Sequence, residues 1–378
     1  LAAFGKLKNL KELFICGTEL QSINALSEVL PLLPLLEKVD LYISVPDARS
    51  KLLFDALEKL RYLKEFPYCA GIKNADVEAF VHALSSLPLL EKLSFGTKLS
   101  RTEYAGQLYT AIGKLKYLRK LVLCIGNTTT INAEVEALAK VLPSLEFLGK
   151  LILVWKKEEE LDRGHKKQLL AAISKLRYLK KLNINFNCDE IPDSYIYFES
   201  LGEMLTSLRL LDKLELIGLK CKNESEKREL LIAVGKLKYL KKLDLIWEKI
   251  TQTNLDDLVQ TLASLQVLEE FTLWVRFYCS HACDDDCDNE CYHNCEDECY
   301  HDPRDECDDE CNHNCYDDSC NKCRHDEYER LKDLVKTEVL SAVRKLKYFK
   351  KSILNQDDII KQARKASTQI MPSPMHSC

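Results

Sequence analysis

A short leucine pattern returns ten times along this chain and constrains its fold more than any other feature. The pattern is L-x-x-L-x-x-L-x-L, and its clearest copies lie within residues 113–123, 175–184 and 235–245. The copies begin 26 to 32 residues apart, at Leu7, Leu33, Leu60, Leu87, Leu115, Leu145, Leu176, Leu208, Leu237 and Leu265. A repeat of nearly fixed length in this range is typical of solenoids, in which each unit packs only against its neighbours.

Each unit is predicted to contain one strand and one helix. The final L-x-L of the pattern has the two-residue period of a strand with one buried face. Between the patterns, residues 74–84, 132–142 and 253–262 have apolar side chains at helical spacing. Asn132 suits the N-cap of the second helix, where Glu134 would face the positive end of the helix dipole. Because one unit cannot bury both apolar faces alone, neighbouring units are expected to stack.

The units alternate between two kinds. One kind ends its helix with a basic phrase, as in residues 115–118, and the other uses Ser-Leu-Pro or a relative of it, as in residues 86–90. This alternation resembles the ribonuclease-inhibitor class of leucine-rich-repeat proteins. The resemblance implies an α/β leucine-rich-repeat solenoid, with a curved parallel sheet on the concave side and helices on the convex side. It also implies that residues flanking the strand leucines face the concave side.

Composition divides the chain into four parts. Residues 1–277 hold about ten strand–helix units, residues 278–325 are a Cys/Asp/His-rich insertion, residues 326–354 hold the last helix with a degenerate repeat, and residues 355–378 are a polar tail. The first unit is expected to be truncated, because Leu1 aligns with the interior of a helix in a later unit. The last repeat is degenerate because Ser352 stands where the pattern has leucine.

The insertion holds eleven of the 17 cysteines and five of the eight histidines, separated by acidic residues. It fits a low-complexity segment without a core of its own. It also fits a metal site, because thiolate and imidazole groups suit Zn²⁺ or Cu⁺, or a redox-active cysteine cluster in an oxidising compartment. The candidate ligands are Cys311, His313, Cys315, Cys320, Cys323 and His325, of which Cys320 and Cys323 have the familiar two-residue spacing of a zinc knuckle. We expect the rest of the chain to require no cofactor.

One position beside the strand leucines is basic in most units. It holds Lys38, Lys92, Lys120, Lys150, Lys181, Lys213 and Lys242. These lysines are expected to form a ladder along one edge of the sheet, either as a solvated rim or as a track for an acidic partner or a polyanion. Because no arginine or exposed aromatic residue is interleaved in that row, specific nucleic-acid binding is not expected.

The two positions after the strand leucines hold large apolar residues, including all three tryptophans. They include Tyr42, Ile125, Trp155, Phe186, Trp247 and Trp274. If these side chains are exposed, they predict a protein-binding groove centred on Trp155, Phe186, Trp247 and Trp274, because tryptophan is enriched at interaction hot spots. If they turn inward beneath the loops, they belong to the core instead.

No known catalytic motif is found in the sequence. His82 fits a helix surface or core position, and His165 follows Arg163 and Gly164 in a charged segment. The net charge of −5 is small for this length and gives no support to nucleic-acid or membrane binding by the whole chain, and no apolar run is long enough to span a bilayer. The leading hypothesis is a monomeric, cytoplasmic, non-enzymatic scaffold that binds a protein. The alternatives are a metal or redox protein, a recognition arm of a larger protein, or a regulator of a small GTPase, since a Ran GTPase-activating protein uses a similar repeat.

Overall fold

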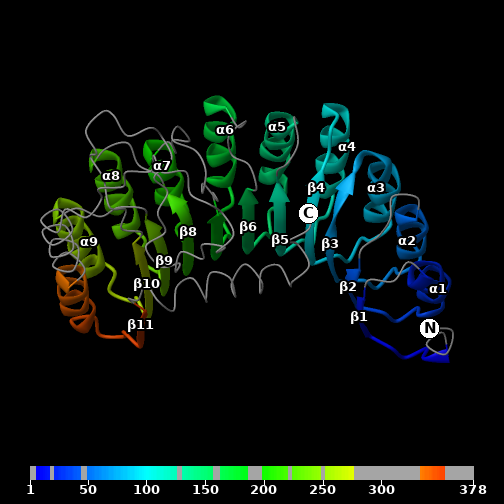
Figure 1. The fold of residues 1–378 in the computed structure, drawn as a ribbon, viewed down its shortest axis with the longest axis horizontal. Helices are drawn as coiled ribbons and strands as arrows, with labels where there is room; N and C mark the ends of the chain where they lie inside the picture. The colour runs from blue at the N-terminus through cyan, green and yellow to red at the C-terminus, as the bar shows by residue number, and fades with distance from the viewer. Residues whose placement is uncertain are drawn as a thin grey trace, which may run out of the picture.

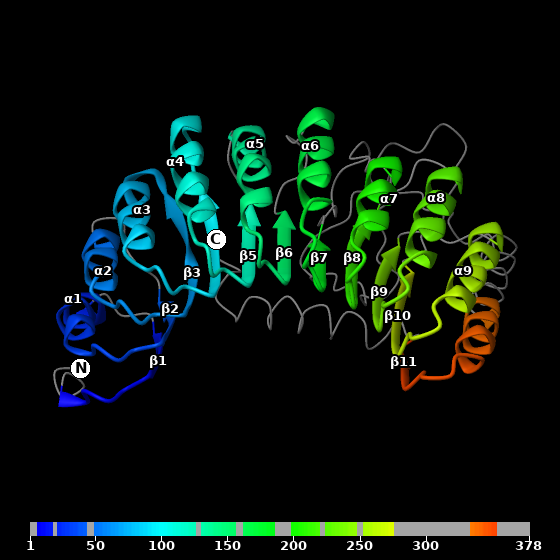
Figure 2. The same cartoon turned by 180° about the vertical axis from the view of Figure 1, so that it is seen from behind.

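The computed structural model describes residues 6–17, 21–43, 49–125, 130–155, 162–185, 198–219, 224–247, 252–275 and 333–353. Within them the chain forms one sheet of 11 strands, ordered from β1 to β11 as in the sequence. The strands pair in parallel and line the inner side of an arc, while the helices cover the outer side (Figures 1 and 2). The predicted α/β leucine-rich-repeat solenoid is therefore confirmed.

The strands begin beside the first leucine of each L-x-L and continue beyond the second. They are β1 (Glu12–Gly17), β2 (Lys38–Ile43), β3 (Glu65–Lys73), β4 (Lys92–Lys98), β5 (Lys120–Ile125), β6 (Lys150–Trp155), β7 (Lys181–Asn185), β8 (Lys213–Leu219), β9 (Lys242–Trp247), β10 (Glu270–Val275) and β11 (Lys351–Ile353). Alternating side chains of a strand face opposite sides of the sheet. The L-x-L leucines therefore face the helices, and the residues between them face the concave side.

Each connection back to the next strand contains a helix. The α-helices are α1 (Gln21–Val29), α2 (Ser50–Leu57), α3 (Val77–Ser85), α4 (Thr102–Gly113), α5 (Ile131–Val141), α6 (Arg163–Ile173), α7 (Phe198–Ser207), α8 (Glu224–Gly235) and α9 (Gln252–Ser264). Short 3₁₀ turns η2 (Leu30–Leu32) and η4 (Leu142–Ser144) follow α1 and α5, and η3 (Asn74–Asp76) precedes α3. Proline near the start of η2 and of η4 ends the α-helical hydrogen bonding there, because its nitrogen cannot donate.

The core lies between the sheet and the helices. The four leucines of the copy at residues 237–245 are each at most 4% exposed, and the other units repeat this arrangement. Burying one such side chain stabilises the fold by roughly 1.5–3 kcal/mol. Where α2 and α3 pack on β3 and β4, Phe54, Phe66, Phe80 and Phe95 form an aromatic cluster with neighbouring ring centroids 5.0–6.5 Å apart.

Backbone hydrogen bonds between units fix the start of each strand. The amide nitrogens of Lys241 and Lys242 both donate to the carbonyl oxygen of Asp212 in the preceding unit, at 2.8 and 3.0 Å. The same pair of bonds joins Lys180 and Lys181 to Gly149. Because this pair of bonds recurs at the start of each strand from β2 to β10, the first residues of these strands are held in register.

The degenerate last repeat still forms a strand. Residues 333–344 are helical, and β11 pairs with β10 so that Ser352 lies opposite Phe271. Loss of the leucine at Ser352 therefore does not prevent pairing with the preceding unit. The insertion at 278–325 and the tail at 355–378 lie outside the described residues. Among the helices that the structure describes, none combines the length and apolarity needed to cross a bilayer.

Candidate binding surface

Six lysines lie side by side at the start of six consecutive strands. The parallel register pairs Lys92 of β4 with Lys120, and then joins Lys150, Lys181, Lys213 and Lys242 in turn. We call these six residues the lysine row. Neighbouring strands are about 4.8 Å apart. Glu65 precedes the row and Glu270 follows it, and the seventh predicted lysine, Lys38, lies beyond Glu65.

The two ends of the lysine row are neutralised by carboxylates. Lys92 forms an ion pair with Glu65, Lys213 forms one with Glu215, and the Lys242 Nζ lies 3.1 Å from a Glu270 oxygen. Although burial acts to lower the pKa of the Lys242 amine, the nearby Asp244 and Glu270 carboxylates raise it above its usual value. The positive charges at these ends are therefore largely neutralised by ion pairs within the protein.

The middle of the lysine row is different. Within the described part of the chain, no carboxylate lies within 4.0 Å of the amines of Lys120, Lys150 or Lys181. Burial and the neighbouring lysines lower the pKa of both the Lys120 and the Lys150 amine. An anion that binds near these ammonium groups would offset the electrostatic repulsion between them. The centre of the row is thus an electrostatically favourable place for an acidic partner.

The next concave row changes character along the sheet. Two residues after the lysines, Val122 and Ile152 form a small apolar cluster with Cys124 and Val154, separate from the main core. Each of the four is 7–9% exposed. From β7 onward the same row becomes polar, in the order Asn183, Glu215, Asp244 and Thr272, which the strand register places side by side.

The polar part of this row contains two carboxyl groups in contact. The Asn183 amide donates to Glu215, and Glu215 lies opposite Asp244. Burial, reinforced by the Glu215 charge, raises the pKa of Asp244 to about 6, although Thr272 and Lys242 act in the opposite direction. Burial also acts to raise the pKa of Glu215, but Lys213 and hydrogen bonds from Asp244 and Asn183 lower it. Below about pH 6 Asp244 therefore holds the proton of the pair, while Glu215 carries the charge.

The predicted aromatic groove is wrong at two of its positions. Trp155 is 2% exposed and Ile125 is 0% exposed, and both pack in the main core. The strands extend two residues beyond the L-x-L, so the two positions after the leucines lie on opposite faces of the sheet. Trp274 is at the alternate position, on the concave side of β10, and is half-buried.

The remaining predicted positions are only partly described. Tyr42 lies in β2 and Trp247 in β9, but their side chains are outside the described residues, as is the whole of Phe186. The predicted metal ligands Cys311, His313, Cys315, Cys320, Cys323 and His325 also lie outside the described residues. Within the described residues, no group of three or more Cys, His, Asp or Glu side chains could hold a metal ion.

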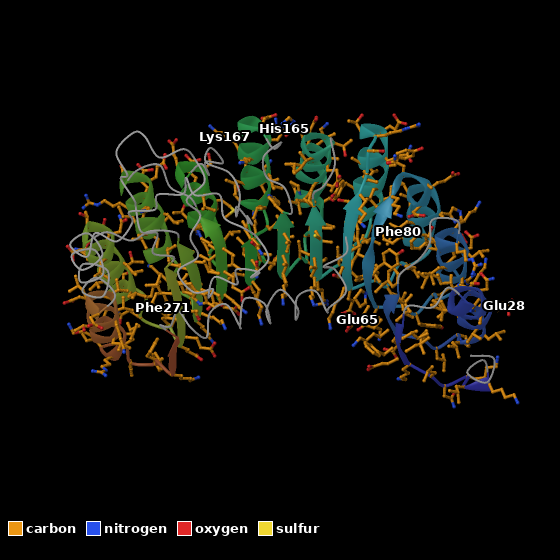
Figure 3. The ribbon with its side chains drawn as sticks, viewed as in Figure 1. Glu28, Glu65, Phe80, His165, Lys167 and Phe271 are labelled. Atoms are coloured by element: carbon orange, nitrogen blue, oxygen red, sulfur yellow. The ribbon has the colours of Figure 1, made fainter. Side chains whose placement is uncertain are left out.

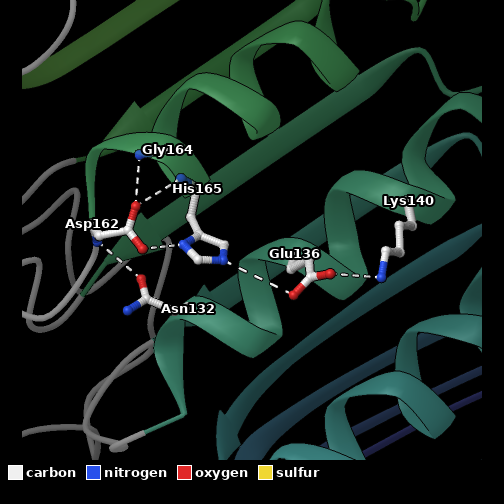
Figure 4. Close-up of polar contacts among 6 residues, drawn as sticks. All are labelled: Asn132, Glu136, Lys140, Asp162, Gly164 and His165. Carbon is white, nitrogen blue, oxygen red and sulfur yellow. Dashed lines mark hydrogen bonds and ion pairs between the residues drawn. The ribbon is translucent and has the colours of Figure 1, made fainter.

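A second polar cluster surrounds His165, at the edge of the sheet opposite Glu65 (Figure 3). Asp162 is the N-cap of α6, and its Oδ1 accepts hydrogen bonds from the backbone nitrogens of Gly164 at 2.6 Å and His165 at 3.1 Å. The other carboxylate oxygen contacts His165 Nδ1 (Figure 4). The hydrogen bond from the His165 backbone nitrogen, together with the one from Gly164, lowers the pKa of the Asp162 carboxyl group.

This cluster joins two units and does not resemble a catalytic site. Asn132 Oδ1 accepts a hydrogen bond of 2.9 Å from the backbone nitrogen of Asp162, and Glu136 lies between His165 and Lys140 (Figure 4). Asn132 was predicted as the N-cap of its own helix, but α5 begins at Ile131 and Thr130 is its N-cap. The polar groups around His165 therefore serve the start of α6 and its contact with α5.

Sequence reasoning missed the polar row of Asn183, Glu215 and Asp244. The signal was present, because these residues are the x of L-x-L in three successive units. Their contact depends on the register between units, which the pattern within a single unit does not specify.

Comparisons with known proteins find distant structural similarity alone. No profile of a known protein family matches the chain, and no curated protein matches its sequence. Among solved structures, the actin-binding site 2 of leiomodin-1 is similar at 13% identity over 42% of this chain and 86% of that chain, with a TM-score of 0.33. Internalin C2 of Listeria monocytogenes is similar at 13% identity over 60% of this chain and 77% of that chain, with a TM-score of 0.32. Both are leucine-rich-repeat proteins; the fold assignment here rests on the eleven-stranded sheet itself.

Proposed function

We propose that this chain is a non-enzymatic binding module that holds an acidic surface of a partner protein on its concave face. The observation that carries the proposal is the middle of the lysine row, Lys120, Lys150 and Lys181, whose amines have no carboxylate within 4.0 Å among the described residues. The long alternating units also support a place near the ribonuclease-inhibitor class of leucine-rich repeats. A continuous parallel sheet provides a rigid concave surface of the kind that repeat proteins use for binding.

The concave face offers complementary chemistry beside that charge. The apolar cluster of Val122, Cys124, Ile152 and Val154 adjoins the middle of the lysine row, and the Asn183–Glu215–Asp244 group follows it. An acidic partner would gain on-rate and orientation from the lysines, because charge complementarity steers association. Contacts to the apolar cluster and to the Asn183–Glu215–Asp244 group would then distinguish one acidic protein from another.

The test is affinity capture with a charge-reversal variant. The immobilised chain, and the Lys120→Glu/Lys150→Glu/Lys181→Glu variant, are incubated with nuclease-treated extract of cells that express the protein, and retained proteins are quantified by mass spectrometry. Proteins retained by the wild type and lost from the variant support the proposal. Identical retention by both forms contradicts it.

A matched control reverses the charge of three lysines that lie outside the concave face. Lys51 on α2, Lys167 on α6 and Lys336 in the helix at 333–344 are exposed and lie on helices instead of strand starts. Lys167 is at the edge opposite Glu65 (Figure 3). The Lys51→Glu/Lys167→Glu/Lys336→Glu variant, called the helix control below, should retain the same proteins as the wild type.

A further inference from the structure

The turns that lead from helix to strand carry a row of exposed aromatic side chains. In the turns from residues 33–36 to residues 265–268, the first and last residues of L-x-x-L are buried, and the backbone nitrogen of the last donates to the carbonyl oxygen of the first, as from Leu118 to Leu115 at 3.1 Å. The two central residues therefore project into solvent. In six turns the second of them is aromatic: it is Tyr62, Tyr117, Phe147, Tyr178, Tyr239 or Tyr348, and these side chains are 53, 53, 55, 57, 61 and 50% exposed.

Five consecutive turns concentrate positive charge around these rings. We call residues 114–119, 144–149, 175–180, 207–212 and 236–241 the turn rim. It contains ten Lys or Arg residues and two acidic residues, Glu146 and Asp212. Within the described residues, Arg119 is the one basic member with an ion pair, to Glu91 at 3.7 Å. Nine of the ten lie in the turns at residues 114–119, 175–180 and 236–241, so cations without an ion pair among the described residues recur in every second unit.

The fold does not require this composition. The turn of residues 87–90 reads Leu-Pro-Leu-Leu and closes with the same backbone bond, from Leu90 to Leu87 at 3.3 Å. Lysines near a helix C-terminus interact favourably with the helix dipole, but that effect falls off within one turn. It does not explain why a tyrosine stands beside the charge. The basic residue and the exposed ring recur together at Lys116–Tyr117, Arg177–Tyr178 and Lys238–Tyr239.

We propose that the turn rim binds single-stranded nucleic acid without sequence preference. Such surfaces combine a basic track for the phosphates with aromatic rings on which bases stack. Here the rings of consecutive units approach closely, since Phe147 and Tyr178 have centroids 6.5 Å apart and planes inclined by 22°. The basic–aromatic pair recurs in every second unit, so the turn rim presents charge and ring together at a repeated spacing.

An acidic protein segment fits the turn rim less well. Charge alone would attract it, and it would gain little from tyrosines repeated every second unit, or roughly every 10 Å at the usual strand spacing. Planar bases linked by anionic groups match both members of each Lys–Tyr or Arg–Tyr pair. This proposal extends beyond the proposed protein-binding function, because the lysine row and the concave face are not needed for it.

Fluorescence anisotropy with a fluorescein-labelled 20-nucleotide oligouridine tests the proposal on the full chain. Tyr117→Ala/Tyr178→Ala/Tyr239→Ala removes the rings without changing charge, and we expect affinity to fall at least tenfold with an unchanged salt dependence. Lys116→Glu/Arg177→Glu/Lys238→Glu should also weaken binding at least tenfold and should reduce the slope of affinity against salt concentration. The helix control should bind like the wild type, and thermal melting should show that all variants fold.

Three outcomes would overturn the proposal. They are no binding of oligouridine by the wild type, equal binding by the tyrosine variant, and displacement by polyglutamate or duplex RNA as effective as displacement by unlabelled oligouridine. Strong binding of labelled polyglutamate without binding of oligouridine would assign the turn rim to an acidic protein instead. Because the Lys120→Glu/Lys150→Glu/Lys181→Glu variant leaves the tyrosines in place, failure here is distinguishable from failure of the concave-face proposal.

Discussion

The hydroxyl of Ser264 donates a hydrogen bond of 3.1 Å to the backbone carbonyl of Gly235 in the preceding unit. Ser144 makes the same contact with Gly113, also at 3.1 Å. A Cβ atom on Gly235 would lie 2.8 Å from the Ser264 oxygen, closer than a normal contact. Glycine therefore stands before the basic phrase because the following helix packs closely there. At Gly235, which ends α8, the close neighbour is α9, and at Gly113, which ends α4, it is α5.

This contact predicts a strong coupling between the two residues. Gly235→Ala should lower the free energy of unfolding by about 1 kcal/mol, because the new methyl group displaces the serine hydroxyl from its hydrogen bond. In a Ser264→Ala background the same change should cost nothing or stabilise the helix, because alanine has the higher helix propensity. Urea unfolding of the four forms measures the coupling, and strictly additive effects would contradict this account.

The buried position of Trp155 predicts a large stability loss on truncation. Trp155→Ala should lower the free energy of unfolding by about 3–5 kcal/mol, as expected for removal of a large aromatic side chain from a core. Trp274, half-buried on the concave side of β10, is the matched comparison, and Trp274→Ala should cost less than half as much. Urea unfolding followed by far-UV circular dichroism checks both; equal losses would show that the two positions are not distinguished by burial.

The repeat pattern was sufficient to predict the solenoid. Each leucine of residues 237–245 is buried by its own helix and by the unit beside it, so a local pattern carries the information about that contact. The predicted helices at 132–142 and 253–262 correspond to α5 and α9 within one or two residues at each end. The same locality explains the lysine row, since one residue at a fixed place in each unit is repeated by stacking.

Features that depend on strand length or on contacts between units were harder to predict. Trp155 was assigned to the concave side, and one further residue of strand reverses the face on which a side chain lies. Asn132 looked like a helix cap, but it contacts the backbone of Asp162, 30 residues away in the next unit. The pairing of Glu215 with Asp244 likewise required the register of β8 and β9.

The cysteine-rich insertion makes a separate prediction about metal. If Cys320 and Cys323 with His325 or their neighbours hold Zn²⁺, the chain purified under reducing conditions should contain stoichiometric zinc by elemental mass spectrometry. Cys320→Ser/Cys323→Ser should lower that content, and Cys124→Ser, which removes a buried cysteine of β5, should not. A metal-free chain whose thiols all react after zinc is supplied would exclude the zinc site.

The contact between Asp244 and Glu215 predicts how stability depends on pH. Burial raises the pKa of Asp244 from 3.8 to about 6, so the folded state binds its proton more tightly than the unfolded state. Its contribution to stability is therefore fully present below pH 3.8 and is lost as the pH rises through 6. Asp244→Asn keeps a neutral side chain throughout, so its stability relative to the wild type should rise between pH 5 and pH 8 by roughly 1–3 kcal/mol.

Urea unfolding at several pH values measures this difference, and the comparison between the two proteins removes the contribution of other titrating groups. Asp55→Asn, at an exposed position on α2, is measured in parallel as a control for replacing a surface carboxylate. If the stability difference between Asp244→Asn and the wild type does not change with pH, the pKa of Asp244 is not raised in the folded state. The charge of the concave face near β9 would then be the same on both sides of pH 6. A partner that contacts this row should in that case bind with no change across this range, whereas a protonated Asp244 makes binding of an acidic partner stronger below pH 6 than above it.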